Sequence, residues 1–291
     1  MQQKSLRVVA WLVLVTPLLG GGNCSRARVE SMNKMNEGVI SAQQKQYMLA
    51  VEQLEQATAI DPANEQAFWN LAIVHIEMQK FERAKDDLKR ALAINDASAT
   101  YYEKLGSVLI ELKSWQEAKD ALEHALKLDA ALFKAHYKLG QVLEELDDPQ
   151  NALREYTEAI KQGPRFIEAY SALGRLYADL GYLEQARQVL EEAMRVVQPK
   201  SEEEATIRQL LGTVYQQKRD LPKAVEHFKA ALEIKPGMSE ALFSLGWTYA
   251  LLQNRDEARR YLKKFVETGG DAPDHYLKAA RDKLSEIEQG F

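Results

Sequence analysis

The chain has 291 residues, of which 46% are hydrophobic and 28% are charged, and its formal net charge is −5. This composition is too apolar for a disordered chain and too poor in Gly and Pro for a fibrous one, so it indicates a folded protein. The single cysteine excludes an intramolecular disulfide and a tetrahedral cysteine zinc site, and the acidic balance argues against a general nucleic-acid binder.

The first predicted element is an export signal over residues 1–23. Lys4 and Arg7 supply positive charge ahead of an apolar run of 12 residues at 8–19, interrupted only by Thr16 and Pro17. That run is too short to cross a membrane comfortably, which takes about 20 residues, and it matches the apolar region of a secretory signal.

Cys24 follows the apolar run at the place where a bacterial lipoprotein signal, which this segment resembles, carries its lipidated cysteine. The resemblance implies a lipid on Cys24, a short tether over residues 24–30, and an exported outer-membrane lipoprotein of the cell envelope facing the periplasm. Gly22 and Asn23 depart from the pattern before the cysteine. Two alternatives therefore remain open: ordinary secretion with an incidental Cys24, and an uncleaved anchor or an unexported protein.

The rest of the chain repeats every 34 residues. An alanine marks each repeat, at Ala50, Ala84, Ala118, Ala152 and Ala186 and, after a four-residue insertion, at Ala224 and Ala258. A small residue precedes each of these alanines by 12 positions, as Gly106 precedes Ala118. Apolar residues at steps of three and four predict two antiparallel helices per repeat, and the small residue lets the two helices approach closely.

This pattern resembles the tetratricopeptide repeat. The resemblance implies an all-α, right-handed superhelical solenoid of helix-turn-helix repeats, closed by a capping helix over residues 273–291. The seven predicted repeats span residues 31–64, 65–98, 99–132, 133–166, 167–200, 205–238 and 239–272. In repeat 31–64, Lys34 and Glu37 replace apolar residues, so its first helix is either an N-terminal cap or loosely packed.

In the resembled family, the first helices of successive repeats line a concave groove that holds protein partners. Transferred by position, the predicted groove has an apolar patch at one end (Trp69, Ile73, Ile76), an apolar patch at the other (Phe243, Trp247), an acidic row (Glu77, Glu111, Glu145, Asp179), and Tyr137 and Arg175 between them. Exposed aromatic residues often carry the binding energy of interfaces, and an acidic row favours a basic or polar partner. Alternatively, the two tryptophans pack into adjacent repeats and the acidic row is only a solvated surface.

The residues show no pattern typical of catalysis. No two of the five histidines have the spacing of a helical metal site, and no glycine-rich phosphate loop is present. We therefore predict no metal, no cofactor, no nucleic acid and no small-molecule substrate.

The expected function is that of a non-catalytic protein-interaction scaffold. The combination of signal, cysteine and repeats resembles tetratricopeptide lipoproteins that assist assembly of outer-membrane machines, such as the pilotins of type IV pilus secretins. The alternatives are a soluble periplasmic or cytoplasmic adaptor that binds peptides of partner proteins and, in a different class, an enzyme.

Overall fold

The computed structural model describes residues 26–269 and 272–289. The predicted signal over residues 1–23 and Cys24 lie outside the described residues. The described part of the chain holds only α-helices as regular elements, in the order α1 (Arg26–Gln43), α2 (Tyr47–Ile60), α3 (Glu65–Glu77), α4 (Phe81–Ile94), α5 (Ala99–Glu111), α6 (Trp115–Leu128), α7 (Phe133–Glu145), α8 (Pro149–Gln162), α9 (Ile167–Asp179), α10 (Leu183–Val196), α11 (Glu202–Gln217), α12 (Leu221–Ile234), α13 (Ser239–Leu251), α14 (Arg255–Thr268) and α15 (Asp274–Glu288). The prediction of an all-α fold is confirmed.

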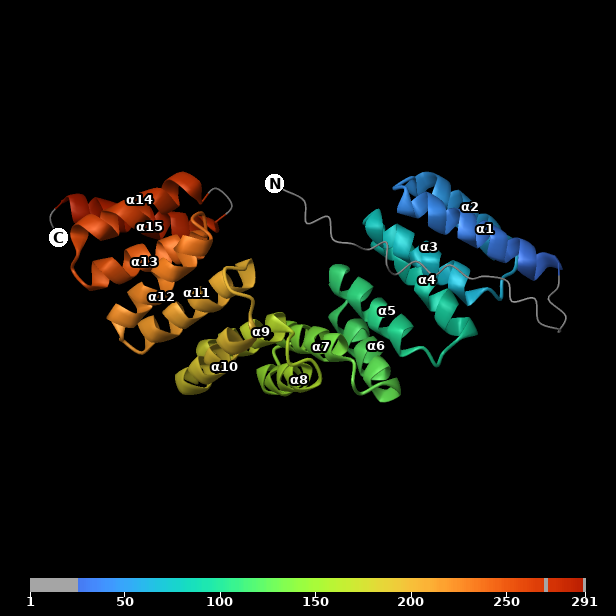
Figure 1. The fold of residues 1–291 in the computed structure, drawn as a ribbon, viewed down its shortest axis with the longest axis horizontal. Coiled ribbons are helices and arrows are strands. Elements are labelled where there is room, and N and C mark those ends of the chain that lie inside the picture. The colour runs from blue at the N-terminus through green and yellow to red at the C-terminus, as the bar shows by residue number, and fades with distance from the viewer. Residues whose placement is uncertain (1–25, 270–271, 290–291) are drawn as a thin grey trace. The chain divides into compact units, whose positions relative to one another are not determined.

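Each predicted repeat contains one pair of consecutive helices, from α1 with α2 to α13 with α14 (Figure 1). The chain separates into two compact units, which we call the N-terminal unit, up to Glu155, and the C-terminal unit, from Tyr156 onward. The boundary between them falls within α8. No helix in the described residues is long and apolar enough to cross a lipid bilayer.

Two helix starts differ from the predicted boundaries. Helix α1 begins at Arg26, so the predicted tether over residues 24–30 is wrong from that residue onward. Helix α11 begins at Glu202, within the four-residue insertion, because Ser201 Oγ accepts the backbone N–H of Glu204 at 3.2 Å. The Glu204 carboxylate in turn accepts the backbone N–H of Lys200 at 2.5 Å. The first bond satisfies a first-turn donor that an uncapped helix would leave unpaired, and the second holds the backbone just before the cap, so the insertion lengthens the helix.

The first repeat is a complete helix pair. Helices α1 and α2 share an apolar core that includes Met35, Ala50 and Leu54, all of which are fully buried. Lys34 and Glu37, which broke the sequence pattern, form an ion pair at 2.7 Å. The two polar side chains satisfy each other at the surface, and the rest of α1 packs as in the other repeats.

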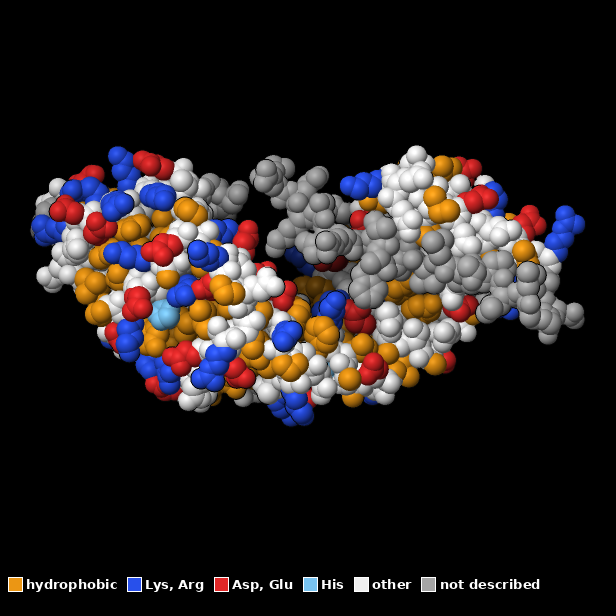
Figure 2. All heavy atoms as spheres, viewed as in Figure 1, with side chains coloured by type: hydrophobic (Ala, Val, Ile, Leu, Met, Phe, Trp, Pro, Cys, Tyr) orange, Lys and Arg blue, Asp and Glu red, His pale blue; other side chains and the backbone are white. Residues whose placement is uncertain are grey.

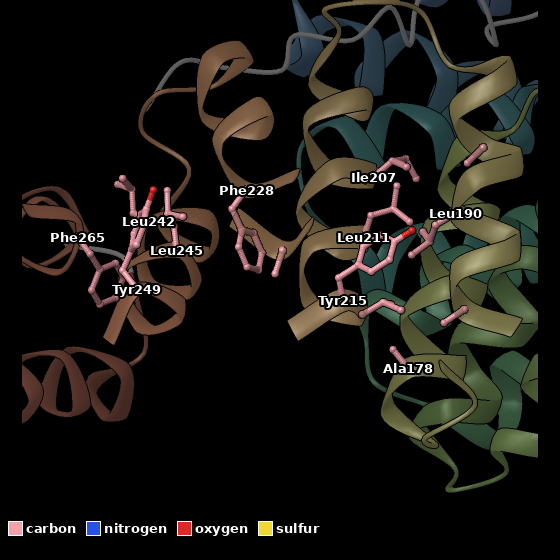
Figure 3. Packing of buried hydrophobic residues seen from close by; sticks show 14 of the residues in the cluster. Ala178, Leu190, Ile207, Leu211, Tyr215, Phe228, Leu242, Leu245, Tyr249 and Phe265 are labelled. Atoms are coloured by element: carbon pink, nitrogen blue, oxygen red, sulfur yellow. The ribbon is translucent and has the colours of Figure 1, made fainter. Parts of the chain in front are cut away.

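The repeated small residue is required by the close contact of the paired helices. A Cβ atom at Gly212 would lie 2.6 Å from the ring of Phe228, and one at Gly106 would lie 2.6 Å from Leu122 Cγ. Figure 3 shows Phe228 and its neighbours in the apolar core of the C-terminal unit, among them Leu190, Leu211, Leu242 and Phe265. Contacts this short exclude a larger side chain unless the helices move apart.

The turn inside each repeat uses a left-handed backbone conformation. After α3, the N–H of Gln79 bonds the carbonyl of Ile76 at 2.9 Å and the N–H of Lys80 bonds the carbonyl of His75 at 2.8 Å, which is the Schellman arrangement. Gln79 has a φ of 56° there. A residue with this left-handed backbone conformation recurs two positions after the end of each first helix, at Lys45, Gln79, Lys113, Asp147, Gly181, Arg219 and Gln253.

The last helix closes the C-terminal unit. Helix α15 packs against α14, with Ala280 fully buried and Ile287 only 6% exposed. A repeat array exposes the apolar face of its last member unless a capping element covers it. The predicted capping helix is therefore confirmed.

Candidate partner-binding surface

The predicted apolar patch on α3 is mostly buried. Trp69 is 3% exposed and Ile73 is 2% exposed, and the ring of Trp69 stacks on Tyr101 of α5 with the ring centroids 4.8 Å apart. The expectation that Trp69 and Ile73 are exposed anchors is wrong, because α3 is buried on all sides from Ala67 to His75. For Trp69, the alternative of packing on the adjacent repeat is what the structure shows. Ile76 is half-buried and lines a cavity.

The four predicted acidic residues share one structural position. Each is the last residue of a first helix and is exposed: Glu77 in α3, Glu111 in α5, Glu145 in α7 and Asp179 in α9. Helix C-termini carry partial negative charge, so a carboxylate there destabilises the helix by about 0.3–1 kcal/mol. The four carboxylates therefore do not stabilise the helices that they end. That the acidic row binds a basic or polar partner stays a prediction.

Arg175 and Tyr137 also lie on first helices. Arg175 is exposed and pairs with Asp179, one turn further along α9, at 3.2 Å. Tyr137 of α7 is half-buried, and its hydroxyl oxygen accepts a hydrogen bond from Gln141 Nε2 at 3.1 Å. Both side chains are thus held by neighbours on their own helix.

A cavity of about 440 Å³ lies between the C-terminal ends of α3 and α5 in the N-terminal unit. Its lining includes Ile76, Glu77, Phe81, Ser107, Val108 and Glu111. Three of these residues were predicted from their repeat position. Ser107 holds the ninth position of its repeat, which the resemblance also places in the groove. Phe81 and Val108 were not predicted, although Phe81 begins α4 at a place that is apolar in most repeats, which is a signal that could have found it.

A buried polar cluster lies beside this cavity on α5 and α7. Glu103 is 9% exposed and forms an ion pair with Lys138, whose Nζ also donates to Ser107 Oγ at 2.5 Å. Burial acts to raise the pKa of Glu103, but the neighbouring Lys138 and Lys104 ammonium groups outweigh it and hold that pKa below its ordinary value. Burial also lowers the pKa of Lys104, while Glu103 partly opposes this.

The aromatic residues predicted for the C-terminal unit meet the capping helix. Phe243 and Trp247 lie one turn apart on α13, with ring centroids 5.7 Å apart. The ring of Tyr276 on α15 approaches Phe243 edge-on at 5.0 Å, and Lys283 Nζ lies 5.3 Å from the centre of the Trp247 ring. Tyr276 and Lys283 are seven residues apart and so share one helix face. Lys283 was not predicted to be part of this surface. Its seven-residue spacing from Tyr276 was the sequence signal that could have found it.

A cavity of about 560 Å³ lies between α13 and α15. Its lining includes Trp247, Ala250, Leu251, Lys283, Glu286 and Ile287. Trp247 is half-buried and Leu251 is 42% exposed, so apolar surface remains accessible there with charged side chains at its edge. Figure 2 shows hydrophobic side chains gathered among charged ones on one face of this unit.

Two histidines of the N-terminal unit each lie against a carboxylate of the neighbouring helix. His75 Nδ1 lies 2.7 Å from Asp87 Oδ2, and His136 Nδ1 lies 2.7 Å from Glu155 Oε2. Within the described residues, no group of three or more His, Cys, Asp or Glu side chains could hold a metal ion. The absence of enzymatic activity stays a prediction.

The family profiles that match this chain all describe the same repeat. Profiles described as tetratricopeptide repeat match residues 38–79, 70–133, 133–164, 165–237 and 215–284. No curated protein sequence matches the chain.

Solved structures agree with this family. YrrB, described as a tetratricopeptide protein with an unusual peptide-binding site, is 26% identical, with 66% of this chain and 97% of YrrB covered and a TM-score of 0.55. MamA of Desulfovibrio magneticus RS-1 is 24% identical, with 60% and 96% covered and a TM-score of 0.54. Pseudomonas aeruginosa pilF is 19% identical, with 75% and 97% covered and a TM-score of 0.61. The last two similarities show the fold alone.

Proposed function

Because this chain belongs to the tetratricopeptide repeat family, whose members are protein-interaction scaffolds, we propose that it holds a segment of a partner protein on the surface of its first helices. The observation that carries the proposal is the accessible cavity between α13 and α15. It combines the half-buried Trp247 with the exposed Leu251, and tryptophan in a partly desolvated pocket is a frequent source of interface energy. The peptide-binding site named for YrrB supports a peptide segment as the ligand.

Photocrosslinking in cells tests this proposal. A photoreactive amino acid is placed at Leu251 in the full chain and, as a matched control, at Leu128, which is also 42% exposed but lies at the end of α6. We expect a discrete protein adduct from Leu251 that is absent from Leu128 and that disappears when Trp247→Ala is added. Equal adducts at both positions, or an adduct that survives Trp247→Ala, would contradict the proposal.

We further propose that the scaffold is tethered through a lipid on Cys24. Each buried acyl methylene contributes about 0.8 kcal/mol, and stable anchoring takes more than one chain. Removal of residues 1–23 removes Lys4 and Arg7 and no acidic residue, so the mature net charge is −5 − 2 = −7. Since an acidic body is not attracted to an anionic membrane surface, the tether itself must hold the protein there.

Membrane fractionation separates the tethered scaffold from a soluble adaptor. Cys24→Ser should release the protein from membranes, whereas the neighbouring control Ser25→Ala should leave it membrane-bound. If Cys24→Ser leaves the distribution unchanged, the lipid tether is refuted: a protein that is soluble in both forms is the soluble adaptor, and one that stays membrane-bound in both forms keeps an uncleaved anchor.

The narrower proposal is a pilotin-like role in assembly of an outer-membrane machine. It is supported by the combination of signal, cysteine and repeats in the sequence, while the similarity to pilF supports the fold only. Deletion of the protein should move a secretin-like subunit out of the outer membrane, and re-expression of the intact chain should return it. Normal localisation of such subunits in the deletion strain would refute this role.

A further inference from the structure

We propose that the cavity between the C-terminal ends of α3 and α5 receives a lysine or arginine side chain of the bound partner. This inference rests on the proposed function, because it names the chemistry of the segment that the scaffold holds. The cavity measures about 440 Å³ and combines apolar side chains with two carboxylates. A long cationic side chain has both of the matching parts.

The apolar part of the cavity fits the aliphatic stem of such a side chain. Val108 is 1% exposed and forms part of the wall with the half-buried Ile76 and Phe81. Lysine and arginine commonly lay their methylene groups along apolar surface while the charged end stays in polar surroundings. A small or acidic side chain would leave this wall uncovered.

The carboxylates of the cavity fit the charged end. Glu77 and Glu111 both line the cavity, both are exposed, and each is the last residue of its helix. Within the described part of the chain, neither carboxylate forms an ion pair with a Lys, Arg or His side chain. The partial negative charge of the two helix ends adds to theirs, so the site favours a cation.

One cation of the protein also lines the cavity. Lys104 lies on α5 and interacts electrostatically with the neighbouring Glu103, which also pairs with Lys138. The two cavity carboxylates therefore outweigh this single lysine.

The acidic helix ends are confined to part of the chain. Helices α3, α5, α7 and α9 end in an acidic residue, whereas α11 ends at Gln217 and α13 ends at Leu251. The lining of the C-terminal cavity includes Trp247 and two cations, Lys283 and Arg255, with one carboxylate, Glu286. An excess of carboxylates over cations is therefore a feature of the N-terminal cavity.

A pair of small probes tests the cavity in the full chain. N-acetyl-arginine amide carries the stem and the cation, while N-acetyl-norleucine amide carries a stem without the cation. We expect the arginine probe to shift the NMR signals of Ile76, Ser107 and Val108 with saturation, and the norleucine probe to shift them far less. Equal shifts from the two probes would overturn the inference.

Matched variants assign the effect to the two carboxylates. Glu77→Gln with Glu111→Gln should weaken the arginine probe at least about tenfold, since both charge-assisted contacts are lost. The control Glu145→Gln removes the equivalent helix-end charge on α7, outside the cavity lining, and should change binding less than about twofold. Circular dichroism confirms that each variant is folded. Unchanged probe binding in the double variant would overturn the inference.

The crosslink at Leu251 keeps this inference separate from the proposed function. If the partner adduct forms and the double variant changes neither the adduct nor probe binding, the cationic site is refuted and the scaffold function stands. If no adduct forms but the double variant abolishes probe binding, the scaffold function is refuted, and the result assigns the cavity an affinity for cationic side chains without a partner segment that supplies one.

Discussion

The first two and the last two repeats fill the same interior position with different chemistry. At the eleventh and twenty-third residues of the repeat, the first two repeats place polar pairs, whereas the third has Leu109 and Ala121 there. Ser41 Oγ donates to Gln53 Oε1 at 2.6 Å in the first repeat, and His75 Nδ1 lies 2.7 Å from Asp87 Oδ2 in the second. The His75–Asp87 pair is almost entirely buried. In the first two repeats the contact between the two helices depends on the geometry of a hydrogen bond between polar side chains.

The last two repeats, in the C-terminal unit, place aromatic pairs at these positions. Tyr215 stacks on His227 with centroids 5.2 Å apart, and Tyr249 stacks on Tyr261 with centroids 5.8 Å apart. Stacked rings gain about 0.5–1.5 kcal/mol beyond their area burial. The repeat thus accepts either kind of contact, because both kinds fill the space between the two helices.

The difference matters when one partner is removed. A buried polar group that loses its partner bears its full desolvation cost, whereas a ring that loses its partner leaves only a smaller contact. We therefore expect the first two repeats to be more sensitive than the last two to single substitutions at these positions.

The largest expected effect is the difference in stability loss between two tryptophans, Trp69 and Trp247, that were both predicted to line the groove. Trp69→Ala should lower the free energy of unfolding by about 3–5 kcal/mol, because Trp69 is 3% exposed and its loss leaves a cavity against Tyr101. Trp247→Ala should cost clearly less, since Trp247 is only half-buried. Urea unfolding followed by circular dichroism measures both. Equal losses would remove the distinction between a core and a binding tryptophan.

The second effect breaks a polar pair and then replaces it with an aromatic one. Asp87→Ala should destabilise the protein by about 3 kcal/mol, because His75 is left buried without its partner. The double variant His75→Tyr with Asp87→His copies the Tyr215–His227 pair and should recover most of this loss. Denaturant unfolding of the single and double variants measures the recovery. A double variant as unstable as Asp87→Ala would show that the two kinds of pair are not interchangeable.

The third effect concerns acid. Burial lowers the pKa of His227 below its ordinary value of 6.5. The unfolded chain therefore takes up a proton near pH 6.5 that the folded protein resists, so stability falls as the pH drops below 6.5, with a slope of at most about 1.4 kcal/mol per pH unit, and levels off below the folded pKa. His227→Tyr, which copies Tyr261, should flatten the decrease between pH 7 and pH 5. The same decrease in the variant would assign it to other groups.

The smallest expected effect lies in the turns. The N-terminal unit uses residues other than glycine at its left-handed positions, such as Asp147 with a φ of 58°, whereas one of the three repeat turns in the C-terminal unit has Gly181 with a φ of 79°. Asp147→Gly should raise the free energy of unfolding by about 0.5–1 kcal/mol, and Gly181→Ala should lower it by about 1 kcal/mol. Thermal unfolding measures both shifts. A loss of stability in Asp147→Gly would mean that its side chain makes a contact that outweighs the backbone strain.

The periodicity of the sequence predicted the helix pairs because each repeat presents the same small and large residues in phase. Gly212 and Phe228 meet for the same reason as Gly106 and Leu122. This information is local and repeated, so the pairing of helices follows from spacing alone. The exceptions, at Arg26 and at Glu202, fall where the period ends or is interrupted.

The surface was less predictable because it depends on residues that do not repeat. Trp69 is covered by Tyr101, at a repeat position where four of the other six repeats have alanine. Trp247 is approached by Lys283, which belongs to the capping helix and has no counterpart in the period. Position in the repeat therefore predicts which side chains belong to a first helix, while single neighbours decide which of them stay accessible.

The dissociation constant of the partner that crosslinks at Leu251 tests the scaffold function most directly. It is measured for the full chain, for Trp247→Ala, and for Trp115→Ala as a control tryptophan that is half-buried at the start of α6. We predict at least a tenfold increase for Trp247→Ala, equivalent to about 1.4 kcal/mol, and a change below about twofold for Trp115→Ala. Equal dissociation constants for the full chain and Trp247→Ala would contradict partner binding at the C-terminal cavity.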